Sequence, residues 1–159
     1  MFFYEKLFLV LVVLFVTTTA FAKPYSRDVN FSLGYSFTVD SPNDAVIHQA
    51  LFDIDTIRLW KLNDLFLLGY AFSFNIDSLG MGLLIGPTVG IKCNEIVDLD
   101  LSAKFGLYIS SDWPAPFETE LRAKFLPNKF VSPIGAYSIS FANGLCTNKF
   151  HAGVALGWK

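Results

Sequence analysis

The chain has 159 residues, of which 53% are hydrophobic and 16% are charged, and its formal net charge is −2. The mean hydropathy of +0.45 is high for a water-soluble domain. A net charge this close to zero provides no electrostatic basis for binding nucleic acid. The length is sufficient for one domain.

Residues 1–22 have the pattern of a secretory signal peptide. Leu7–Val16 is an unbroken apolar run, and Ala20-Phe21-Ala22 is an A-x-A cleavage site. An apolar run of about ten residues is too short for a transmembrane helix, which needs about 20. We therefore expect Sec-type export with cleavage between Ala22 and Lys23, which leaves residues 23–159 as a single domain.

After the signal peptide, apolar residues alternate with small or polar ones. In the stretch that begins at Val29, every second residue is apolar up to Val39. This period of two is typical of β-strands with one apolar face. No later window resembles an apolar membrane helix of about 18 residues. The pattern predicts strands at about 29–40, 48–60, 65–75, 79–92, 97–110, 117–126, 130–142 and 149–158.

The composition of the two strand faces indicates which one is the outside. One face carries large apolar residues such as Phe31, Phe72 and Leu101, and the other carries mainly glycine, serine and charged residues. Small residues suit a crowded barrel interior, and the apolar face then meets lipid. Backbone groups in hydrocarbon need internal partners, which only helices and closed barrels provide. We therefore expect an all-β fold, a closed eight-stranded antiparallel up-and-down transmembrane β-barrel.

An even number of strands places both termini on one side of the membrane, which for an exported chain is the periplasm. Turns near 61–64, 93–95 and 127–129 should lie on that side. The second strand leaves its register open, because Ile57 and Leu59 fall on the polar side. Either a bulge near Thr56 reverses the alternation, or Arg58 faces lipid near the interface, where the cost is about 0–1 kcal/mol.

In architecture, the whole mature chain resembles the small eight-stranded outer-membrane β-barrel proteins, such as OmpX, OmpW and the barrel domain of OmpA. Proteins of this kind usually end in an outward-facing aromatic residue, whereas here Lys159 follows Trp158. The resemblance implies an outer-membrane location, insertion by the barrel-assembly machinery, and roles in anchoring, adhesion or small-solute passage. Outer-membrane lipid and the assembly machinery are the expected partners, and a monomer without a cofactor is the expected form.

Charged residues are predicted to face the barrel interior. Asp53 and Asp55 do so on the second strand, and carboxylates spaced in this way could serve acid–base catalysis or bind a metal. Buried charges need partners, however, and mixed signs favour an ion-pair network that plugs the barrel. We therefore expect no catalytic, cofactor or metal site. The predicted structural network of the fifth and sixth strands comprises Asp98, Asp100, Lys104, Glu118, Glu120, Arg122 and Lys124.

Other residues with possible chemistry are few. His151 is predicted to point inward, near Ser138, Ser140 and Glu118, but no local signature supports nucleophilic catalysis. Cys93 and Cys146 should lie at opposite ends of the barrel, too far apart for a disulfide. The aromatic residues predicted to lie at the membrane–water interfaces are Trp60, Tyr70 and Trp158.

We favour a non-enzymatic outer-membrane barrel with a plugged polar lumen and a structural or surface-interaction role. The alternatives are a small-solute conduit of the OmpW type and a lipid-modifying barrel enzyme. A lipocalin-like soluble ligand binder is the rival fold. Its narrow interior would have to hold the aromatic face, which would overfill it.

Overall fold

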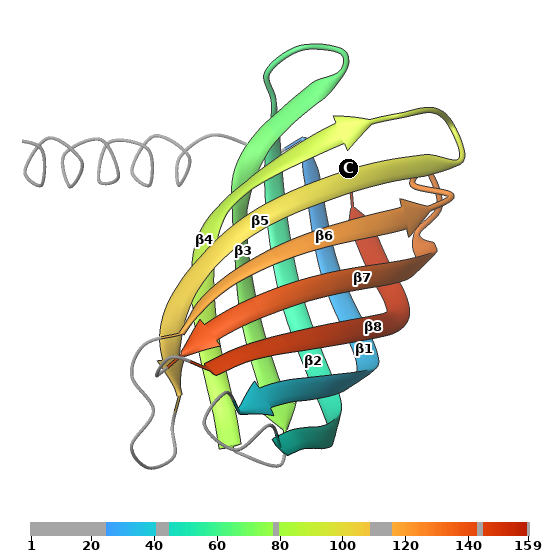
Figure 1. Ribbon diagram of the computed structural model, residues 1–159. Coiled ribbons are helices and arrows are strands. Elements are labelled where there is room, and N and C mark those ends of the chain that lie inside the picture. The colour runs from blue at the N-terminus through green and yellow to red at the C-terminus, as the bar shows by residue number, and fades with distance from the viewer. Residues whose placement is uncertain (1–24, 41–44, 78–79, 109–115, 143–144, 159) are drawn as a thin grey trace, which may run out of the picture.

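The computed structural model describes residues 25–40, 45–77, 80–108, 116–142 and 145–158. In these residues the chain forms one closed barrel (Figure 1). Its strands are β1 (Ser26–Asp40), β2 (Ala45–Lys61), β3 (Phe66–Asp77), β4 (Gly80–Lys92), β5 (Val97–Tyr108), β6 (Phe117–Phe125), β7 (Val131–Ala142) and β8 (Leu145–Trp158). Each strand pairs antiparallel with its sequence neighbour, and β1 also pairs with β8. The predicted fold is confirmed, whereas the predicted signal peptide lies outside the described residues.

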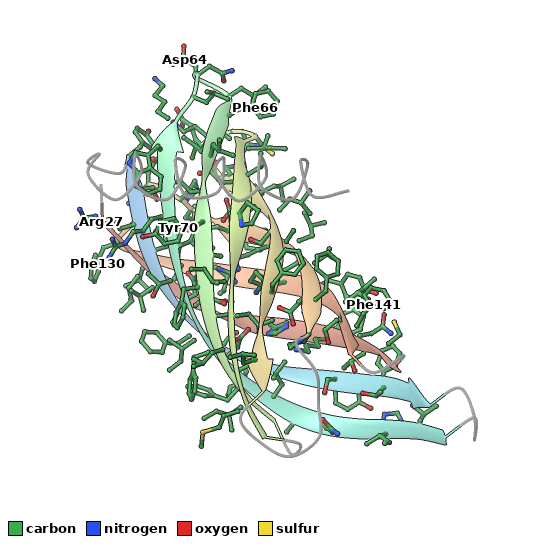
Figure 2. All side chains as sticks on the ribbon, turned by 90° about the vertical axis from the view of Figure 1, so that its left-hand side faces the viewer. Arg27, Asp64, Phe66, Tyr70, Phe130 and Phe141 are labelled. Atoms are coloured by element: carbon green, nitrogen blue, oxygen red, sulfur yellow. The ribbon has the colours of Figure 1, made fainter. Side chains whose placement is uncertain are left out.

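The outer wall of the barrel is apolar and the interior is polar. Leu33 is 70% exposed, whereas its neighbour Ser32 is 4% exposed. Every strand carries exposed large apolar side chains. Figure 2 shows side chains standing out from the wall, with the exposed Phe66 and Phe141 labelled. This orientation is the reverse of a lipocalin, in which the apolar face would line the cavity. No helix of the described residues is long and apolar enough to span a membrane.

Several strands differ in length from the prediction. β2 begins at Ala45 and β8 at Leu145, so each takes in residues that we assigned to loops. The β1–β8 ladder continues into this region, where the hydroxyl groups of Thr38 and Thr147 are hydrogen-bonded at 2.8 Å. β6 ends one residue early because Leu126 has a φ of 54°, in the left-handed region that begins a turn.

The register of β2 is continuous, and no bulge interrupts it. Its pairs with β1 run without a gap from Ser26–Leu59 to Asp40–Ala45. Arg58 is therefore on the outer wall and is exposed. Ile57 and Leu59 are inside, where they form an apolar cluster with side chains of β3. The interior is polar over most of its length but apolar at this place, and that is why the alternation seemed to reverse.

Glycines on the inner face allow the wall to bend sharply. A Cβ added at Gly106 would lie 1.8 Å from the carbonyl oxygen of Leu83, and one added at Gly86 would lie 1.8 Å from that of Ala103. The β4–β5 ladder has no pair at Gly86 or at Pro87, which lacks an N–H group. Glycine kinks of this kind introduce the curvature that a small barrel requires.

We predict that Gly106→Ala destabilises the barrel, because the new methyl group would overlap a backbone oxygen of β4. The expected loss is about 1–3 kcal/mol in the free energy of unfolding, as for other overpacked sites. Urea unfolding in lipid vesicles measures it. Gly135→Ala on β7 is the matched control, because a Cβ there meets nothing within 4 Å. Equal losses in the two variants would contradict this account of the bend.

Candidate functional site: the barrel interior

Lys104 of β5 is the centre of the interior. Its side chain is completely buried, and its Nζ lies 2.9 Å from Glu118 and 2.8 Å from Glu120, both on β6. The same ammonium donates a hydrogen bond of 2.8 Å to the hydroxyl of Ser73 on β3. An ammonium group has three N–H donors. Lys104 therefore makes two hydrogen bonds, to Ser73 and Glu120, and an ion pair with Glu118.

Two further cations extend this cluster across the barrel. Arg122 contacts both Glu120 and Asp55, and the second contact joins β6 to β2. Lys149 of β8 donates to Glu118 at 2.7 Å. The charges alternate in sign along the chain of contacts, so each carboxylate lies between two cations. We call this set the central network: Asp55, Lys104, Glu118, Glu120, Arg122 and Lys149.

His151 lies beside the central network in a Ser–His–Asp arrangement. Its Nδ1 is 3.3 Å from Asp53, and its Nε2 is 3.3 Å from the hydroxyl of Ser138. This is the order of contacts in a hydrolytic triad. Ser138 is 0% exposed, however, so a substrate would have no access to its hydroxyl.

The same place holds residue types that ligate metals. One ligand atom from each of Asp53, Glu120 and His151 lies within 4.8 Å of the others. Asp53 is 1% exposed, and neither of its carboxylate oxygens has a hydrogen-bond partner. Glu120 is already in contact with Lys104 and Arg122, and these fixed positive charges oppose a metal cation.

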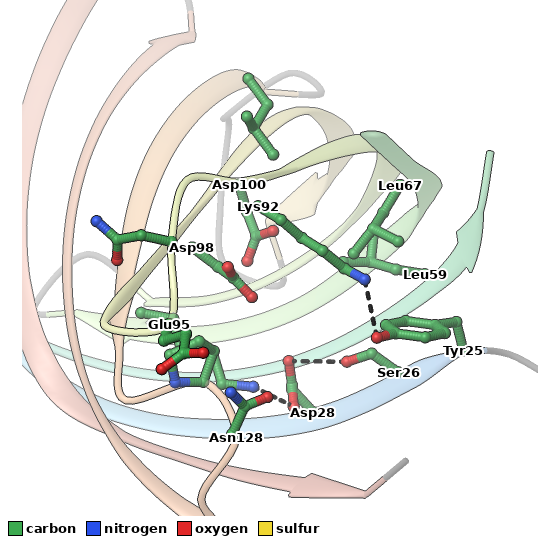
Figure 3. A pocket seen from close by; sticks show the side chains of 14 residues that line it. Tyr25, Ser26, Asp28, Leu59, Leu67, Lys92, Glu95, Asp98, Asp100 and Asn128 are labelled. Atoms are coloured by element: carbon green, nitrogen blue, oxygen red, sulfur yellow. Dashed lines mark hydrogen bonds and ion pairs between the residues drawn. The ribbon is translucent and has the colours of Figure 1, made fainter. Parts of the chain in front are cut away.

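A pocket of about 290 Å³ opens at the end of the barrel that carries the described turns (Figure 3). Lys124 donates to Asp28 at 2.7 Å on one side of it. Lys92 donates to the Tyr25 hydroxyl at 2.8 Å and lies 3.9 Å from the centre of that ring. The pocket is a vestibule at the mouth of the barrel, lined by both charged residues and apolar ones such as Leu59 and Leu67.

The inner boundary of the mouth pocket adjoins the central network. Asp98 and Asp100 of β5 both line the pocket. In the β5–β6 register Asp100 is opposite Arg122, which belongs to the central network. The vestibule therefore leads toward the network, with one cross-strand pair marking where the two meet.

The structure divides the seven predicted residues between these two places. Lys104, Glu118, Glu120 and Arg122 belong to the central network, whereas Asp98, Asp100 and Lys124 line the mouth pocket.

Two charged interior residues were not predicted. Asp28 lies one position before the predicted start of the first strand. Lys149 lies two residues before His151, and alternate residues of a strand share one face. This alternation was the signal that could have placed Lys149 inside.

Outside the barrel, the rings of Trp60 and Tyr70 lie 5.7 Å apart, centre to centre, on adjacent strands. The side chain of Trp158 lies outside the described part of the structure. His48 is exposed on the outer wall, where it is hydrogen-bonded to Tyr35. Cys93 and Cys146 are free.

No protein-family model matches the sequence, and no curated protein matches it. Solved structures do match in fold. One, from a study of de novo designed transmembrane β-barrels, has 15% identity and a TM-score of 0.58, over 86% of this chain and 98% of that chain. The fold is that of the small eight-stranded transmembrane barrels.

Two natural outer-membrane proteins support the same assignment. Neisserial surface protein A has 11% identity and a TM-score of 0.53, over 82% of this chain and 96% of that chain. Ail, the attachment invasion locus protein of Yersinia pestis, has 16% identity and a TM-score of 0.50, over 82% of this chain and 98% of its own. Identities this low show a common fold and nothing more specific.

We predict that Glu118→Gln strongly destabilises the barrel, because it removes a charged partner from both Lys104 and Lys149 in a buried site. Breaking a buried ion pair from one side costs about 3–5 kcal/mol. Chemical unfolding in vesicles measures the loss. Asp64→Asn is the control, because the Asp64–Lys61 ion pair lies on an exposed turn and should contribute nothing measurable. A Glu118 variant as stable as the control would show that the central network does not hold the barrel together.

Proposed function

We propose that this protein is a small integral outer-membrane β-barrel with a plugged polar lumen, and that its role is structural or one of surface interaction without enzymatic activity. The observation that carries the proposal is the central network, which joins β6 to β2 across the interior through Arg122 and Asp55. Outer-membrane lipid would cover the apolar wall. We further propose that the chain is exported, inserted by the barrel-assembly machinery, and functions as a monomer.

Burial of the central network argues against a solute conduit. Lys104 and Glu118 are each 0% exposed, so no water-filled path passes beside them. A solute that crosses this level would have to separate their ion pairs. Because breaking a buried pair costs about 3–5 kcal/mol, open passage would compete with the stability of the barrel itself.

The end of the barrel opposite the described turns supports a modest surface role. Only residues 41–44, 78–79, 109–116 and 143–144 connect the strands there. Connections of two to eight residues provide little chain for elaborate surface machinery. A structural contribution to the membrane therefore fits this sequence better than a large binding apparatus.

The Ser138–His151–Asp53 arrangement favours one second candidate, a hydrolase. We place it behind the structural role because Ser138 is completely buried. If the refolded barrel hydrolysed a phospholipid or a short-chain ester, and Ser138→Ala abolished this activity while folding normally, the hydrolase would replace our proposal.

Conductance in planar lipid bilayers tests the plug directly. We expect no steady ion current through the wild-type barrel, because the central network closes its interior. The double variant Lys104→Ser, Glu120→Ser removes one cation and one anion from the middle of the network, so we expect it to pass small, frequent currents.

The control for this experiment is the double variant Thr88→Ala, Ser102→Ala. It removes a buried pair of hydroxyl groups, 2.8 Å apart, that bridges β4 and β5 inside the barrel. This variant should remain closed. Heat-modifiable migration on a gel would show that each variant is folded. Steady currents through the folded wild-type barrel would contradict the proposal.

A further inference from the structure

We propose that Arg27 and Arg58 form a binding site on the outer wall for the phosphate group of an anionic membrane phospholipid. The inference rests on the proposed function, because it requires that the outer wall faces lipid. It adds a specific lipid contact that neither the plug nor the fold requires.

The two arginines are direct neighbours on adjacent strands. Arg27 of β1 is opposite Arg58 of β2, and both side chains are exposed on the outer wall. The next outward pair along the strands is Val29 and Thr56. These residues and Asp28, whose carboxylate accepts a hydrogen bond from Lys124, line a depression. Two guanidinium groups and one hydroxyl can therefore donate to a single bound group.

Neither arginine has a counter-charge in the described part of the structure. No ion pair or side-chain hydrogen bond joins Arg27 or Arg58 to another described residue. Like charges directly opposite each other on a sheet destabilise it. In the interior, by contrast, each cation of the central network contacts a carboxylate. An anion from outside the chain would remove the repulsion between the two arginines.

The position of the pair corresponds to the level of lipid headgroups. Tyr70 of β3 is opposite Arg58, and its ring packs beside that of Trp60. Aromatic residues gather at the membrane–water boundary of such barrels. Figure 2 shows Arg27 and Tyr70 at a similar level, below the turn that carries Asp64. A lipid phosphate at this boundary would lie within reach of both arginines.

The residue type suits a phosphate. A guanidinium group presents a planar fork that matches phosphate oxygens in a bidentate way, whereas an ammonium group acts as a point charge. Phosphatidylglycerol carries a net negative charge, but in phosphatidylcholine a choline cation lies next to the phosphate. A site with two positive charges should therefore prefer phosphatidylglycerol.

Native mass spectrometry of the refolded, detergent-solubilised barrel tests the site, with phosphatidylglycerol and phosphatidylcholine titrated separately. We expect one phosphatidylglycerol to bind the wild type about tenfold more tightly than phosphatidylcholine, because its phosphate forms charge-assisted hydrogen bonds without a competing cation. Arg27→Gln and Arg58→Gln should each abolish this preference. Lys129→Gln, which removes an exposed cation from the turn before β7, should retain it.

Each result counts for or against the site. Equal binding of the two lipids by the wild type would overturn it, and so would an unchanged preference in both arginine variants. Displacement of the lipid by millimolar inorganic phosphate would show a site for free phosphate and overturn the lipid assignment. Failure of the proposed function would be seen separately, as a wild-type chain that shows no heat-modifiable migration and takes up no detergent.

Discussion

The hydrogen-bonded pairing of β1 with β8 is the interaction on which the rest of the structure depends. It runs from Arg27–Trp158 to Val39–Cys146 and leaves the sheet without an edge. In hydrocarbon an unpaired backbone group costs several kcal/mol, so an open sheet would be excluded from the membrane. Closure permits a wall of exposed Phe, Leu and Ile, which in an aqueous protein would promote aggregation.

Closure with eight strands also determines how the interior must be filled. A barrel of this size is only wide enough for side chains to meet across it. Asp55 on β2 and Arg122 on β6 do meet, although three strands separate them in either direction around the wall. Because a buried charge is costly unless it is paired and hydrogen-bonded, the alternating signs of the central network follow from the narrow interior. The inner face combines these long charged residues with glycine, and the wall can therefore bend tightly around them.

The charged side chains inside the barrel differ in their partners from the two arginines on the outer wall. Inside, Lys104 donates hydrogen bonds to Ser73 and Glu120 and forms an ion pair with Glu118, so protein atoms supply its counter-charges. On the outer wall, Arg27 and Arg58 repel each other and have no protein partner among the described residues. The first arrangement supports a closed structural barrel. The second suggests that the surrounding membrane contributes to the stability of the wall.

The sequence by itself determined the strand number, the closed barrel and the polarity of its two faces, because side chains of a strand alternate from residue to residue wherever the strand lies. The same alternation placed Lys104, Glu118, Glu120 and Arg122 inside. It left the register of β2 unresolved, because Ile57 and Leu59 belong to an apolar interior cluster that only the packed structure reveals. The contacts of Lys149 with Glu118 and of His151 with Asp53, and the pairing of Arg27 with Arg58, were decided by tertiary structure. Which residues meet depends on strand register and on reach across the lumen, and neither is a local property of the chain.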